Sequence, residues 1–174
     1  ALTLSLAPAV AVLGAIALPL AQVTVLTASG LILWRLAQPR LPEELAWRLT
    51  LSYFLSGAVI GPMLENFHDL IWYPLFGFLI LGGLLDHRWR QVALASIALL
   101  LAREDSGLLV FSIGLWAAVR RPRARLIGVV LMVMSFAWVV VVTGLIQPSV
   151  DTSLSDRFLQ EKFGHLYKFI LKYN

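Results

Sequence analysis

The segment from Leu126 to Ile146 contains no charged residue and is long enough to cross a bilayer. A spanning helix needs roughly 20 apolar residues to cover about 30 Å of hydrocarbon. Only 14% of the residues in the whole chain are charged, whereas soluble domains carry about 25%. The uncharged segment and the low content of charge together predict an integral membrane protein built from α-helices.

Charged clusters divide the rest of the chain into further apolar runs, which predict about six membrane helices. The first run is too long for one span, and we expect Pro19 to break it into a membrane-associated helix and a span from Leu20 to Leu36. The other predicted membrane segments are residues 46–64, 70–85, 91–102, 107–119 and 126–146. Residues 1–150 therefore predict an all-α, polytopic transmembrane helix bundle.

Residues 151–174 have a different pattern. Apolar side chains recur at near-helical spacing from Leu154 to Ile170, and Arg and Lys lie between them. This pattern predicts a C-terminal amphipathic helix on the extracytoplasmic interface. The chain begins with Ala1, and the last helical pattern continues to Asn174. We therefore expect a fragment of a longer polytopic protein.

The positions of Lys and Arg predict the orientation in the membrane. Arginines gather in the loops at residues 35–48, 86–90 and 120–125, whereas acidic clusters lie at residues 65–69 and 103–106. Because basic loops tend to stay in the cytoplasm, the alternation predicts a multi-pass protein of the cytoplasmic (inner) membrane with extracytoplasmic acidic clusters. The basic loops also explain the net charge of +4, so we expect no nucleic-acid partner.

Residues 91–119 are expected to form a short helical hairpin. The rival interpretation, one tilted helix, places Arg103, Glu104 and Asp105 at the bilayer centre, where three ionisable groups cost at least several kcal/mol. Each arm of the hairpin, about twelve residues long, reaches only about 18 Å. The tip is therefore expected to lie below the outer membrane surface, in a cavity lined by carboxylates.

Two clusters are candidates for chemistry. At the hairpin tip, Glu104 and Asp105 can bind a divalent cation or act as a general base, and Arg103 can pair with a phosphate. The same residues also suit an ordinary helix start, with Asp105 or Ser106 as the cap. In the other cluster, adjacent His68 and Asp69 can supply a metal ligand or an acid–base pair. That cluster also suits a solvated loop.

The motif Asn66-Phe67-His68-Asp69, followed by Ala102-Arg103-Glu104-Asp105-Ser106-Gly107-Leu108, resembles a bacterial family of predicted membrane proteins, domain of unknown function 2079. The segment from Arg157-Phe158 to Phe163-Gly164 also resembles this family, and the resemblance covers nearly all of the chain. The family is similar in layout to GT-C-type polytopic glycosyltransferases, which take a sugar from a lipid-linked phosphosugar at the extracytoplasmic face.

The resemblance implies a transferase with a polyprenyl-phosphate sugar donor and membrane lipids as partners. Glu104 and Asp105 are then the catalytic candidates, whereas Arg103, His68 and Asp69 are the substrate-binding candidates. A divalent cation held by Glu104 and Asp105 is the candidate cofactor. Such enzymes usually carry a key acid in the first outer loop, which we expect to precede this chain, so the fragment alone is expected to be inactive.

Two other functions agree with the same pattern. In a transporter or flippase, the buried acids would carry protons or cations. In a non-catalytic subunit of a membrane complex, both acidic clusters would tolerate alanine. The sequence alone leaves both alternatives open.

Overall fold

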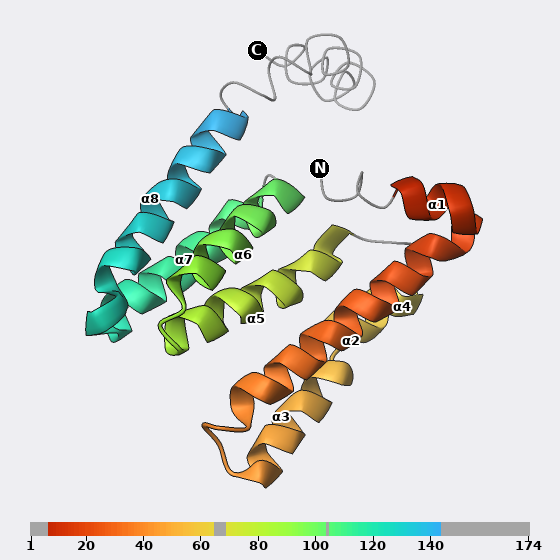
Figure 1. The fold of residues 1–174 in the computed structure, drawn as a ribbon, viewed down its shortest axis with the longest axis horizontal. Coiled ribbons are helices and arrows are strands. Elements are labelled where there is room, and N and C mark those ends of the chain that lie inside the picture. Colours follow the sequence, from red (N-terminus) through yellow and green to blue (C-terminus); the bar gives the residue numbers. More distant parts are fainter. Residues whose placement is uncertain (1–6, 65–68, 104, 144–174) are drawn as a thin grey trace, which may run out of the picture.

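The computed structural model describes residues 7–64, 69–103 and 105–143, and every regular element in this part of the chain is helical (Figure 1). The elements are α1 (Ala7–Leu13), η2 (Gly14–Ile16), α2 (Ala17–Ala37), α3 (Glu43–Phe54), α4 (Gly57–Leu64), η3 (Asp69–Ile71), α5 (Trp72–Leu85), α6 (Trp89–Ala102), α7 (Ser106–Arg120), η4 (Pro122–Ala124) and α8 (Arg125–Val141). The all-helical prediction is confirmed for these residues.

The helices form two groups that meet where α2 packs on α5. In one group the chain reverses at each turn, so α5 pairs with α6 and α7 pairs with α8, while α3 folds back along α2 in the other (Figure 1). The main core belongs to the first group and comprises Ile80, Leu84, Val92, Ala95, Leu99, Leu100, Val110, Ala117, Ala124 and Leu131. This core fixes the relative positions of the turns that connect the consecutive helices from α5 to α8.

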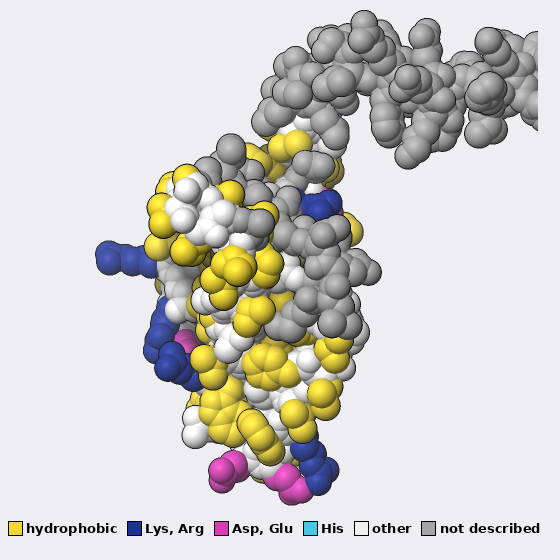
Figure 2. Space-filling view, turned by 90° about the vertical axis from the view of Figure 1, so that its right-hand side faces the viewer, with side chains coloured by type: hydrophobic (Ala, Val, Ile, Leu, Met, Phe, Trp, Pro, Cys, Tyr) yellow, Lys and Arg dark blue, Asp and Glu magenta, His cyan; other side chains and the backbone are white. Residues whose placement is uncertain are grey.

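The outward faces of the helices are strongly apolar. Leu108, Leu126 and Phe136 are 74%, 77% and 67% exposed, and Figure 2 shows hydrophobic side chains over much of one face, with charged groups mainly toward its lower end and one edge. Large apolar patches are unfavourable in water but suit the hydrocarbon of a bilayer. Together with the charge deficit, this surface supports a membrane environment.

Helix length confirms only part of the predicted set of spans. Among the described residues, two helical segments are long and apolar enough to cross a membrane: α2, with 21 residues, and Pro122–Val141, with 20. The apolar helices α5, α6 and α7 have only 14, 14 and 15 residues. At 1.5 Å per residue, these three reach about 21–23 Å, so their length does not establish the predicted count of about six.

The break near the start of the chain is not at Pro19. The interruption lies at Gly14, whose φ of +62° is a left-handed conformation that favours glycine. Pro19 lies in the first turn of α2, where its missing N–H group has no partner to lose. The predicted break at proline is therefore wrong, because a proline in a first turn is compatible with a continuous helix.

The predicted span at residues 46–64 is also wrong as a single helix. It divides into α3 and α4 at Leu55 and Ser56. The Ser56 hydroxyl donates to the Tyr53 carbonyl over 2.8 Å, and the Ser56 carbonyl accepts from the N–H groups of Val59 and Ile60, both at 3.0 Å. A Ser-Gly pair is a common site of helix kinks, because the serine side chain competes for backbone groups.

The helical hairpin at residues 91–119 is confirmed. Helix α6 ends at Ala102, Arg103 has an extended backbone with φ −149° and ψ 157°, and α7 begins at Ser106. A single helix through this region is therefore excluded. The amphipathic helix at residues 151–174 lies outside the described residues, so it stays a prediction, as does the boundary at residue 150.

Candidate functional site

Asp105 occupies the N-cap position of α7, in the turn that follows α6. Its side chain makes no capping hydrogen bond to the helix. The Ser106 hydroxyl does not cap α7 either, because it donates backwards to the Arg103 carbonyl over 2.7 Å. The predicted helix start at Asp105 and Ser106 is therefore confirmed, but neither side chain caps the helix, and the Asp105 carboxylate has other partners.

Those partners lie on α5 and in the turn itself. The Tyr73 hydroxyl, in the first turn of α5, donates to Asp105 Oδ1. Arg103 Nε donates to the same oxygen over 2.9 Å. Asp105, Tyr73 and Arg103 form what we call the Asp105 cluster, which joins the start of α5 to the α6–α7 turn.

The environment of Asp105 favours its charged form. Partial burial on its own raises the pKa of the carboxyl, but the hydrogen bonds from Tyr73 and Arg103 and the Arg103 charge outweigh this effect, so the pKa lies below its usual value. Asp105 is therefore ionised at neutral pH. Its stabilising contribution is present above the pKa of the unfolded state and is lost as the pH falls through the pKa of the folded state.

An apolar groove of about 460 Å³ starts at Asp105 and follows the seam between α7 and α8. The hydroxyls of Ser135 and Thr143 on its wall donate to the Met132 and Val139 carbonyls of α8, at 3.0 and 2.7 Å. The groove is lined by Asp105, Gly107, Leu108, Phe111, Ser135, Phe136, Val139 and Thr143. An open apolar groove with one ionised carboxylate in its lining suits an amphiphilic ligand better than a polar one.

The structure brings together only part of the predicted site. Arg103 and Asp105 are in direct contact, while Glu104 and His68 lie outside the described residues. Asp69 begins η3, but its side chain is not described. Within the described ranges, no three His, Cys, Asp or Glu residues come together as a metal site would require. A divalent cation therefore stays a prediction that depends on Glu104.

Sequence reasoning did not assign Tyr73 to the site. Its hydroxyl donates a hydrogen bond to Asp105, which is 32 positions away in the sequence. The only available signal was its place in the first turn after the acidic segment at residues 65–69. Such a signal identifies the end of a helix but does not predict that Tyr73 contacts Asp105.

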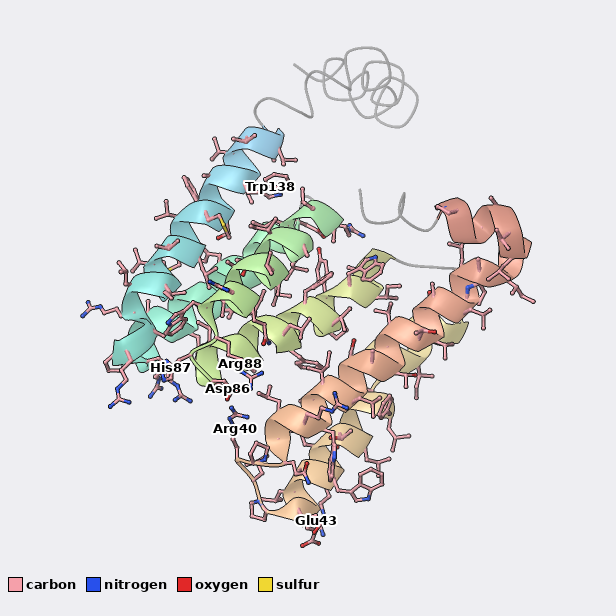
Figure 3. All side chains as sticks on the ribbon, in the orientation of Figure 1. Arg40, Glu43, Asp86, His87, Arg88 and Trp138 are labelled. Carbon is pink, nitrogen blue, oxygen red and sulfur yellow. The ribbon has the colours of Figure 1, made fainter. Side chains whose placement is uncertain are left out.

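The predicted basic loops meet at the other end of the α5–α8 group. Arg40 pairs with Asp86 and thereby joins the α2–α3 turn to the α5–α6 turn (Figure 3). His87, in the latter turn, shares a pocket with residues 120–124 of the α7–α8 turn. All three basic turns therefore lie at one end, and α6 separates them from Asp105 (Figure 1).

Residues 1–173 match the protein family described as "Predicted membrane protein (DUF2079)". No match is found among curated proteins. No solved structure matches the chain.

Proposed function

The chain belongs to the DUF2079 family of predicted membrane proteins, and we propose that it forms part of a GT-C-like glycosyltransferase that uses a lipid-linked phosphosugar. The observation that carries the proposal is the position of Asp105 at the end of the apolar groove between α7 and α8. A lipid-linked phosphosugar has the matching structure: a long apolar tail joined to a charged phosphate and a polar sugar.

Each part of this ligand has a chemical counterpart in the site. The groove takes up the tail, because its walls are apolar and its two hydroxyls already donate to carbonyls of α8. The Arg103 guanidinium, 2.9 Å from Asp105, supplies a cationic group for the phosphate. Ionised Asp105 accepts a hydrogen bond from the acceptor hydroxyl and orients it toward the sugar, while Tyr73 holds the carboxylate in place.

The proposal includes a sidedness. In a multi-pass arrangement across the cytoplasmic membrane, the three basic turns face the cytoplasm, and the Asp105 cluster faces the extracytoplasmic side. The hairpin helices have 14 and 15 residues and reach about 21–23 Å, less than the roughly 30 Å of hydrocarbon. This shortness supports a recessed site that the tail of a membrane-bound donor reaches laterally.

Asp105→Asn in the full-length protein, expressed in its native host, tests the transferase proposal. We expect about a 100-fold loss of sugar transfer, seen by mass spectrometry of lipid extracts as accumulation of the lipid-linked sugar. Glu43→Gln is the matched control, because Glu43 is an exposed carboxylate at the opposite end of the molecule (Figure 3). Equal lipid profiles for the wild type, Asp105→Asn and Glu43→Gln would overturn the proposal.

The transporter alternative has weaker support. A group that carries protons must change its protonation state during transport, whereas Tyr73 and Arg103 both donate hydrogen bonds to the Asp105 carboxylate and stabilise its charged form. The alternative of a non-catalytic subunit predicts that Asp105→Asn has no effect on lipid-linked sugars. Equal lipid profiles for the wild type and Asp105→Asn would therefore favour this alternative over the transferase.

A further inference from the structure

A second pocket lies at the basic end of the molecule, far from the Asp105 cluster. It has a volume of about 400 Å³ and lies between the α5–α6 turn and the α7–α8 turn. Its lining consists of Leu84, His87, Arg120, Arg121, Pro122, Arg123 and Ala124. We call it the arginine pocket. Two segments more than 30 positions apart in the sequence build it, so the fold and not a local charge run creates the concave shape.

The charge of the arginine pocket is not neutralised by the described part of the chain. Asp86 is the nearest carboxylate in sequence to His87, and it pairs with Arg40. Within the described ranges, no ion pair involves Arg120, Arg121 or Arg123. The Arg121 guanidinium lies over the Trp116 ring, 5.5 Å from its centroid, which orients the group without removing its charge.

His87 adds an independent observation. Its φ is +58°, the left-handed region that glycine prefers, and it follows the end of α5. The Arg88 N–H donates to the Gly83 carbonyl over 2.8 Å, so this turn is a Schellman motif with His87 at the position usually held by glycine. Glycine adopts this conformation without strain, whereas the histidine places an imidazole at the wall of the pocket.

We propose that the arginine pocket binds a phosphate group, as the phosphate of either an anionic phospholipid or a soluble phosphate ester. Planar guanidinium groups donate paired hydrogen bonds to phosphate oxygens, and an imidazole N–H donates another. The bound phosphate bridges the α5–α6 and α7–α8 turns. Because these turns belong to different helical pairs, binding also stabilises the contact between the pairs.

The test uses the purified full-length protein in phosphatidylcholine nanodiscs with and without phosphatidylglycerol. We expect Arg120→Gln combined with Arg123→Gln to reduce retained phosphatidylglycerol, measured by native mass spectrometry, about tenfold. Arg90→Gln combined with Arg125→Gln is the matched control. These exposed arginines lie at the same end and carry the same charge, but they do not line the pocket. If both double variants retain equally little phosphatidylglycerol, retention depends only on the general surface charge, and the proposal is overturned.

Two further arms separate the sources of the phosphate and the role of the histidine. If millimolar glycerol phosphate releases the retained phosphatidylglycerol, the pocket is assigned to a soluble ester. If the lipid stays bound, the pocket is assigned to the lipid. Both results support a phosphate site. His87→Gly removes the imidazole and relieves the backbone, so we expect weaker retention of phosphatidylglycerol with no loss of thermal stability in phosphatidylcholine alone. Unchanged retention in both His87→Gly and the pocket double variant would contradict the proposal.

Discussion

Gly128→Leu is expected to lower the free energy of unfolding by about 3 kcal/mol, because it separates α7 from α8. A Cβ atom at position 128 would lie 2.5 Å from the Ala118 nitrogen and 2.6 Å from the Gly114 oxygen. Both are backbone atoms, so no rotamer relieves the clash. At position 114, a Cβ atom would lie 2.8 Å from the Gly128 oxygen. Small residues allow this backbone contact between membrane helices.

Thermal unfolding in detergent measures the effect of Gly128→Leu. Gly61→Leu is the matched control, because a Cβ atom at Gly61 meets nothing within 4 Å, and we expect a melting temperature close to that of the wild type. The separation of α7 and α8 also opens the groove at Asp105, so we expect the rate of sugar transfer to fall together with the melting temperature. If Gly128→Leu melts at the wild-type temperature, the observed α7–α8 crossing is contradicted.

Gly83→Ala is expected to cost about 1–2 kcal/mol, although alanine normally stabilises a helix by about 1 kcal/mol relative to glycine. The added Cβ atom would lie 2.7 Å from Val92 Cγ2, 3.2 Å from the Val92 nitrogen and 3.3 Å from the Arg88 oxygen. Val92 is 1% exposed, and its β-branched side chain has little rotamer freedom. The α5–α6 turn must therefore open.

The neighbouring glycine supplies the control for Gly83→Ala. A Cβ atom at Gly82 would lie 3.5 Å from Leu36 Cδ1 and 3.7 Å from Gln91 Nε2, which are ordinary van der Waals contacts. Gly82→Ala should therefore melt at or slightly above the wild-type temperature. Equal melting temperatures for the two variants would show that the α5–α6 turn is looser than the structure has it.

Charged clusters predicted the turns well, because a charge is costly inside hydrocarbon and therefore marks the end of a helix. Helices α5 and α6 end at Leu85 and Ala102, the residues predicted from the sequence. Breaks made by backbone conformation were harder to predict. Gly14 and Ser56 interrupt helices within apolar runs, where hydropathy carries no signal.

The candidate site was predictable only where its residues are close in sequence. Arg103 and Asp105 are two positions apart and were identified together, and they are in contact. The partner Tyr73 and the groove depend on tertiary packing: α5 against the α6–α7 turn, and α7 against α8 through Gly114 and Gly128. A hydropathy pattern predicts that helices pack but does not determine which faces meet.

Cysteine labelling from each side of the membrane tests the central claim most directly; residues 1–174 contain no cysteine, and any cysteine of the full-length protein outside them is first replaced by serine. Leu70→Cys places a thiol at the Asp105 end, where Leu70 is 43% exposed, and Arg90→Cys places one among the basic turns. We predict that a membrane-impermeant maleimide labels Leu70→Cys in intact cells but labels Arg90→Cys only after permeabilisation. Labelling of both positions from the same side would contradict the proposed sidedness, and with it an extracytoplasmic Asp105 site.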